Sequence, residues 1–206
     1  MLLTGCATLQ LPEVVVQPVS QYRLFQSKEG LVVSIDPFLE KRRVKELFGI
    51  NLLSKGILPV LIVVENRSTD ATFWLQKELS SLEMLNIKSI GKQVVTSSLE
   101  QGEIGMGEKV LTGVVAGVGA VVPAVAIIGG PVVIIVAKSE ANRQIIMQNL
   151  IKKELKERTI TSGQSQHGFL YFKLPDKTAI ETISAIQLKA MNLQKRETLT
   201  FHFSIK

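Results

Sequence analysis

The sequence predicts a mainly β fold, a β-sandwich that is interrupted by a helical insertion. Runs of β-branched and aromatic residues stand before residue 80 and after residue 167, and a long stretch without charge lies between them. With 206 residues, of which 46% are hydrophobic, the chain can form one domain with a sizeable core. We therefore expect a tether at residues 1–20, one sandwich domain at 21–206, and an inserted helical element at about 103–158.

The strands expected before the insertion are bounded by turn residues. Residues 30–38 form one apolar run that ends near Pro37, and residues 57–65 form a second run rich in valine and isoleucine. The cluster Asn-Arg-Ser-Thr-Asp at 66–70 is typical of a turn, and residues 71–79 follow it as another strand. This arrangement predicts an antiparallel hairpin between 57–65 and 71–79.

Further strands are expected after the insertion. Residues 168–174 (GFLYFKL) end before Pro175, and residues 179–188 are a weaker candidate. From Leu199 to Ile205 apolar residues alternate strictly with polar ones, which predicts a strand with one buried face. The two histidines are expected at exposed positions, with His202 on the polar face of this strand and His167 in a turn at 162–168.

Two amphipathic helices are also expected. Residues 38–48 have apolar side chains at helical spacing, with Lys41, Arg42 and Arg43 between them, and Gly49 can end the helix. Residues 139–158 have an apolar stripe and a charged remainder. This second helix either packs against the core or lies on a membrane surface, and its sequence does not decide between them.

The insertion contains 28 residues without charge, 110–137, between two lysines. Its length suits a transmembrane segment, but a single span would separate the strands on its two sides. A helical hairpin would return the chain to the same side. Its contacts are expected with a bilayer or with other subunits, or alternatively with its own domain. The small or helix-breaking residues that we assign to these contacts are Gly113, Gly117, Pro123, Gly129, Gly130 and Pro131.

The amino terminus contains the sequence Leu-Thr-Gly-Cys at residues 3–6, which resembles the lipobox of bacterial lipoproteins. Small residues before the cysteine allow a transferase to attach diacylglycerol to the thiol of Cys6, and the amine freed by cleavage can receive a further chain such as palmitate. Only five residues precede Cys6, so we expect that a longer signal peptide was truncated or starts upstream. Alanine, not aspartate, follows Cys6, which in such lipoproteins implies an outer-membrane location.

No pattern of residues predicts catalysis. The sequence Gly-Gln-Ser-Gln-His at 163–167 lacks the last glycine of a nucleophile elbow, and the glycines near residue 105 lack the lysine of a phosphate loop. One cysteine and two histidines make a structural zinc site improbable. We therefore expect a non-enzymatic protein without a cofactor. The net charge of +6 comes without basic residues alternating with aromatic ones, so nucleic-acid binding is not expected.

Several short motifs resemble those of uncharacterised bacterial envelope lipoproteins that have an immunoglobulin-like domain. They are Phe-Gly-Ile-Asn-Leu at 48–52, Gly-Ile-Leu-Pro-Val at 56–60, Val-Glu-Asn at 64–66, the glycine-rich apolar stretch, and GFLYF at 168–172. The resemblance covers most of residues 30–175. It implies an immunoglobulin-like sandwich and an envelope location, and it implies no activity.

These observations together favour a lipid-anchored protein that faces the periplasm and acts as a scaffold or component of a membrane-associated assembly. Its expected partners are the membrane, through Cys6 and residues 110–137, and other envelope proteins or further copies of the chain. The alternative is a lipid-handling protein in which residues 110–137 line a hydrophobic cavity. A carbohydrate-binding sandwich is less favoured, because Trp74, the largest aromatic platform, is expected in the core.

Overall fold

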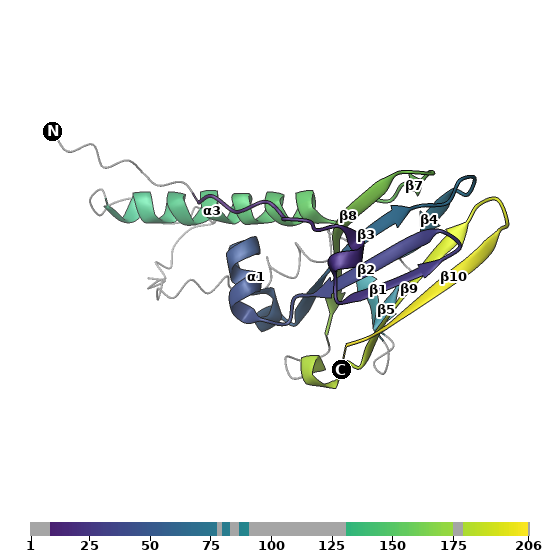
Figure 1. Ribbon diagram of the computed structural model, residues 1–206. Helices are drawn as coiled ribbons and strands as arrows, with labels where there is room; N and C mark the ends of the chain where they lie inside the picture. The colour runs from purple at the N-terminus through teal and green to yellow at the C-terminus, as the bar shows by residue number, and fades with distance from the viewer. Residues whose placement is uncertain (1–8, 78–79, 83–86, 91–130, 175–178, 206) are drawn as a thin grey trace, which may run out of the picture.

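The computed structural model describes residues 9–77, 80–82, 87–90, 131–174 and 179–205. They form a mainly β protein with two antiparallel sheets and, among these residues, two α-helices (Figure 1). The strands are β1 (Leu24–Lys28), β2 (Leu31–Pro37), β3 (Ile57–Asn66), β4 (Phe73–Leu75), β5 (Ser81–Leu82), β6 (Ile87–Ile90), β7 (Thr159–Ile160), β8 (Ser165–Lys173), β9 (Ala185–Asn192) and β10 (Glu197–Ser204). The helices are α1 (Lys41–Phe48) and α3 (Pro131–Lys153), with short 3-10 turns at Val19–Gln21, Leu52–Lys55 and Ala179–Thr182.

The first sheet has the strand order β1-β2-β3-β8-β6. In the second sheet, β9 pairs with β10 along one edge and with β4 and β5 along the other, and β7 adds to β4. Pairing between β5 and β6 joins the two sheets. Buried side chains from both sheets belong to one continuous core.

Strand β3 lies at the centre of the first sheet and is buried on both faces. Eight consecutive residues from Ile57 to Val64 are buried, which explains why the sequence there is apolar throughout and does not alternate. One face is covered by the second sheet. On the other face, Phe169 of β8 lies 5.0 Å from the ring centroids of both Phe38 and Phe48, so the helical side of the molecule is anchored by edge-to-face aromatic contacts.

The alternation at the carboxy terminus is confirmed. Phe201 and Phe203 of β10 are buried opposite Leu188 and Ile186 of β9, while the polar residues between them face outward. The strand expected at 179–188 starts later, because residues 179–182 form a 3-10 turn and β9 begins only at Ala185.

The predicted hairpin between residues 57–65 and 71–79 is wrong. Strand β3 pairs with β2 and β8 in the first sheet, whereas β4 pairs with β9 and β7 in the second. Asn66 is the physical reason: its buried amide donates hydrogen bonds to the carbonyl oxygens of Ala71 (2.7 Å) and Ile160 (2.9 Å). These bonds bend the chain from one sheet to the other, where a hairpin turn would have returned it to its neighbour.

Both predicted helices are present near their expected positions, but their first and last residues differ from the prediction. Helix α1 lies within residues 38–48, and Gly49 ends it in the left-handed conformation with φ of 75°. Helix α3 begins at Pro131, eight residues before the expected start, and ends at Lys153. It ends early because Leu155 donates its backbone N–H to the carbonyl oxygen of Phe169 in β8 (2.9 Å).

Strand β8 is longer than expected. It begins at Ser165, so His167 lies within a strand opposite Val63 and not in a turn. The bends of the chain at Ser162 and Gly163 come earlier than the sequence suggested. His167 and His202 are both exposed, on different sheets.

Candidate functional site

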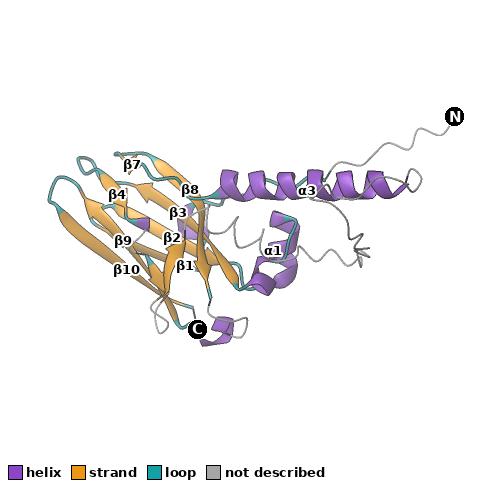
Figure 2. Ribbon diagram, turned by 180° about the vertical axis from the view of Figure 1, so that it is seen from behind, coloured by secondary structure: helices purple, strands orange, loops and turns teal. Residues whose placement is uncertain are grey.

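The segment before the first sheet, residues 9–18, is extended and packs against the domain; we call it the N-terminal arm. Four apolar side chains, Leu9, Leu11, Val14 and Val16, are partly buried against the core. Figures 1 and 2 both show the arm running beside α3 toward the sheets. The part of the expected tether that the structure describes is therefore seated on the domain.

Two lysines near the end of α3 hold the arm. Lys152 forms an ion pair with Glu13, and this hydrogen bond lowers the pKa of the Glu13 carboxyl. Lys153 donates to the carbonyl oxygen of Pro12 (2.8 Å) and to the side chain of Asn149. Burial lowers the pKa of Lys153 because it disfavours the charged form. The polar contacts fix the register of the arm on the helix.

The arm, α1 and α3 meet at Gly49. A β-carbon at this position would lie 3.0 Å from Leu11 of the arm and 3.1 Å from Ile146 of α3. Asn149 of α3 also donates to the carbonyl oxygen of Leu47 (3.0 Å), which occupies an acceptor at the end of α1. A β-carbon here would require small shifts of the Leu11 and Ile146 side chains, and the positive φ of 75° also favours glycine at this junction.

The buried hydroxyl of Tyr171 attaches α3 to the first sheet. It donates to the carbonyl oxygen of Leu150 (3.1 Å), and burial raises the pKa of the phenol, which keeps the donor protonated. Burial along α3 extends from Ile146 onward, whereas Glu140, Ala141 and Gln144 are exposed. The start of the helix points away from the sheets (Figure 1). None of the helices described is both long and apolar enough to cross a membrane.

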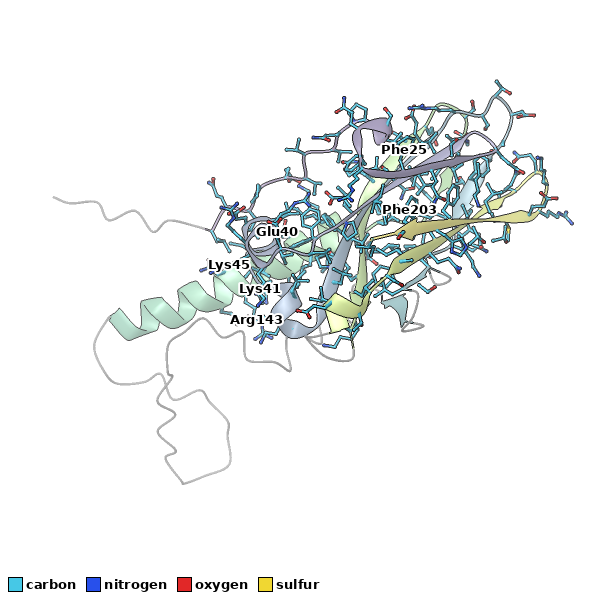
Figure 3. The ribbon with its side chains drawn as sticks, turned by 60° about the horizontal axis from the view of Figure 1, so that its bottom comes forward. Phe25, Glu40, Lys41, Lys45, Arg143 and Phe203 are labelled. Carbon is cyan, nitrogen blue, oxygen red and sulfur yellow. The ribbon has the colours of Figure 1, made fainter. Side chains whose placement is uncertain are left out.

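The exposed surface of α1 is basic. Lys41, Arg42 and Lys45 are exposed, and Arg143 of α3 lies beside this surface with Glu40 (Figure 3). These positions belong to the helical side of the molecule. We call the exposed side chains of Lys41 and Lys45, together with the partly buried Arg143, the basic surface.

A shallow cleft of about 370 Å³ lies between the arm, β2 and α1. Arg43 and Asp36 form a two-pronged ion pair in its wall, with Nη1 to Oδ1 at 2.9 Å, and the guanidinium carbon lies 3.7 Å from the ring centroid of Phe38. The remaining wall is mixed, with the polar side chains of Gln17, Gln21 and Arg23 and the largely apolar ones of Val15, Tyr22, Leu24, Ile35, Pro37, Leu39 and Ile205. Asp36 satisfies the Arg43 guanidinium, whereas Arg23, which also lines the cleft, is exposed and forms no salt bridge with any residue that the structure describes.

Most of the residues predicted to contact the membrane lie outside the described residues. These are Cys6, Gly113, Gly117, Pro123, Gly129 and Gly130. Pro131 is described and begins α3, a position that suits proline because its missing N–H would have no partner in the helix. Trp74, expected in the core, is only partly buried in β4.

The structure brings no candidate catalytic residues together among the parts of the chain that it describes. The same residues contain no group of three or more His, Cys, Asp or Glu side chains that could hold a metal ion. Neither the docking of the arm on the domain nor the position of Arg143 beside the basic helix α1 was predicted from the sequence. The spacing of Leu9, Leu11, Val14 and Val16 was the available signal, since a free tether has no need of regularly placed apolar residues.

Comparisons with protein-family models, with curated proteins and with solved structures found no match to this chain. The arrangement of residues therefore provides the basis for a function. The described residues form a mainly β protein with two sheets at one end. The N-terminal arm, the start of α3 and the basic surface lie at the other, helical end.

Proposed function

We propose that this protein is a non-enzymatic envelope lipoprotein, anchored through a lipid on Cys6, that serves as a scaffold or component of a membrane-associated assembly. One observation carries the proposal. The arm that leads back toward Cys6 is packed beside α3, and α3 begins at Pro131 within the apolar stretch 110–137. The described residues that adjoin both candidate membrane contacts thus lie on the helical side of the molecule, away from the two sheets.

The distances support an anchor close to the domain. Three residue steps separate Cys6 from Leu9, and such a segment spans at most about 11 Å. Because the arm is held by Lys152 and Lys153, a lipid on Cys6 would keep the helical side near the bilayer. A flexible tether of the same total length would leave the orientation of the domain free.

The finer features of the fold belong to the same proposal. We infer an immunoglobulin-like arrangement of the strands, supported by the antiparallel pairing of the two sheets and by their shared core. The proposed helical hairpin includes residues 110–130, which lie outside the described residues; α3 would supply the start of its second arm at Pro131. The periplasm-facing, outer-membrane location rests on Cys6 and Ala7.

Detergent phase partitioning tests the attachment. The protein is expressed with its natural leader as wild type, Cys6→Ser, a deletion of residues 110–130, and both changes together. We expect the wild type in the detergent phase, and a shift of Cys6→Ser toward the aqueous phase. If Cys6→Ser partitions as the wild type does while the deletion alone becomes aqueous, Cys6 is not the anchor.

The scaffold role is tested separately by chemical cross-linking in intact cells. We expect defined cross-linked products with envelope proteins or with a second copy of the chain. Recovery of the monomer alone would argue against an assembly. Lipid that co-purifies in stoichiometric amount, identified by mass spectrometry, would instead support the lipid-handling alternative.

A further inference from the structure

The four basic residues of α1 differ in their ion pairing. Arg43 forms the two-pronged pair with Asp36, and Arg42 lies 3.8 Å from Glu46, one turn later. Lys41 and Lys45 are exposed and form no salt bridge with any residue that the structure describes. Arg43 is therefore compensated at close range and Arg42 only by a weak exposed contact, while the charges of the two lysines are presented to solvent.

The uncompensated pair is unfavourable for the helix itself. Lys41 and Lys45 are four residues apart, so they lie on the same face and repel one another. The first turn of α1 also contains no acidic residue. The buried face of the helix, with Val44, Leu47 and Phe48, provides its packing without either lysine. An external anion would reduce the repulsion between Lys41 and Lys45, and the packing of the helix does not depend on either lysine.

Arg143 of α3 adds a third cation beside the two lysines (Figure 3). Its nearest carboxylate is that of Glu140 at 3.8 Å, the same distance as between Arg42 and Glu46, and both of these solvent-accessible pairs are weak. Glu40 is the carboxylate labelled next to this group in Figure 3, and it precedes α1 as its N-cap without a side-chain capping bond. The cations Lys41, Arg42, Lys45 and Arg143 thus outnumber the nearby carboxylates of Glu40, Glu46 and Glu140 by one.

We propose that the basic surface formed by Lys41, Lys45 and Arg143 binds the anionic headgroups of the membrane on which the protein is anchored. This inference rests on the proposed function, because it takes the lipid bilayer as the surface next to the helical side. Charge complementarity selects the ligand class: phosphate-bearing lipids attract clustered lysine and arginine side chains, and long basic side chains extend readily toward headgroups.

The spacing along α3 agrees with this assignment. The helix starts with seven uncharged residues, 131–137, which cover about 10 Å at 1.5 Å per residue. Arg143 is six residues beyond Ala137, or about 9 Å further along the axis. With α3 near the membrane normal and residues 131–137 in the hydrocarbon, the backbone of Arg143 would lie just outside the headgroup layer, which occupies about 5–8 Å on each side, and its long side chain could extend back into that layer.

Vesicle sedimentation tests the proposal on the full chain with Cys6→Ser, so that no lipid anchor contributes. The probes are vesicles of phosphatidylcholine alone and vesicles with about a third of phosphatidylglycerol, at low and at high salt. We expect preferential binding to the anionic vesicles, reduced by salt. In the same background, Lys41→Glu/Lys45→Glu should weaken binding to anionic vesicles about tenfold or more.

Lys156→Glu/Lys189→Glu is the matched control. It makes the same change in net charge at lysines next to or within the second sheet, and it should lose far less affinity. Circular dichroism and thermal unfolding confirm that each variant is folded, and Lys41→Gln/Lys45→Gln provides a milder variant if the double reversal unfolds.

Three results would overturn the proposal: no binding of the Cys6→Ser chain to anionic vesicles, equal binding to neutral vesicles, or an equal loss in both double variants. The first two would leave an acidic protein or a nucleic acid as the ligand of this surface. Each outcome is independent of whether Cys6 is lipidated in cells, which phase partitioning measures on its own. If the protein is lipidated in cells but does not bind anionic vesicles, the proposed function stands and the inference about the basic surface is wrong.

Discussion

A single buried amide directs the chain from one sheet to the other. Asn66 uses both ends of its side chain: the nitrogen donates to Ala71 and Ile160, and the oxygen accepts from the backbone and hydroxyl of Ser68 at 3.0 and 2.6 Å. No other residue type has two donors and an acceptor in so small a side chain. The crossing of the chain thus depends on hydrogen bonding more than on apolar packing.

We predict that Asn66→Ala lowers the free energy of unfolding by about 2–4 kcal/mol, because buried carbonyl groups lose their donors. Urea denaturation measures this value. Thr69→Ala in the same turn is the control, since Thr69 is exposed and should cost under about 0.5 kcal/mol. Equal effects of the two substitutions would show that the amide has no special role.

Glu29 connects the turns at the far ends of the two sheets. Its carboxylate accepts from the side-chain amide of Asn192 (2.8 Å) and pairs with Lys195 (3.2 Å). The hydrogen bond from Asn192, followed by that from Lys195, lowers the pKa of Glu29 from its ordinary value of 4.5. The ionised form is therefore favoured in the folded protein.

This pKa shift predicts a pH dependence. A carboxyl group whose pKa is lowered by folding stabilises the protein above its unfolded pKa, and this contribution disappears as the pH falls through the folded pKa. The Tm of the wild type should therefore fall more steeply than that of Glu29→Gln from about pH 5 downward. Glu181→Gln, at an exposed carboxylate in the 3-10 turn 179–182, should keep the steep wild-type profile.

At the scale of elements, Gly168 allows the chain after α3 to lie against β8. A β-carbon there would lie 2.4 Å from Cα and 2.6 Å from the backbone nitrogen of Leu155. The close approach permits the hydrogen bond from Leu155 to Phe169. The glycine that opens the GFLYF motif is thus required by packing and not by an unusual backbone angle.

We predict that Gly168→Ala destabilises the protein by about 1–3 kcal/mol or more, because backbone atoms cannot move aside as a flexible side chain does. Amide hydrogen exchange at Leu155 should become faster in this variant. Gly163→Ala is the comparison: its φ of 73° strains alanine, but nothing lies within 4 Å of the added carbon, so Leu155 should keep its protection. Unchanged exchange at Leu155 in Gly168→Ala would contradict the packing argument.

Elements with a regular pattern could be predicted from the sequence. The alternation from Leu199 to Ile205 gave the final strand, and the run ended by Gly49 gave the first helix. The pairing of β4 could not be predicted, because the turn cluster after β3 is equally compatible with a hairpin and with a crossing between sheets. Only the environment of Asn66, which includes Ile160 from a distant part of the chain, decides between the two.

The candidate functional residues could be recognised in the sequence, but their positions relative to one another in space could not be predicted. The lipobox and the apolar stretch suggested membrane contact, and the lysines of α1 were visible as a basic group. Their relation depends on α3 lying next to both α1 and the arm, through Asn149 and Lys153, which are contacts between residues more than 100 positions apart. Patterns within a short window contain no information on such contacts.

For the whole molecule, one end is formed by the β-sheets and the opposite end by the helices. The sheets form one end, with polar outward faces on β9 and β10, while the arm, α1 and α3 form the other (Figure 2). A protein anchored at its helical end would present its sheets to partners in the periplasm. This orientation would relate the proposed lipid on Cys6 to the start of α3 and to the basic surface.

The mass of the mature amino-terminal peptide tests this account most directly. The protein is expressed from its natural gene in its own host, recovered from the membrane fraction, and digested for mass spectrometry. The account predicts a peptide that begins at Cys6 and has the mass of a diacylglyceryl group on the thiol, with or without an additional acyl chain on the amine. A peptide that extends before Cys6 with an unmodified thiol would contradict it.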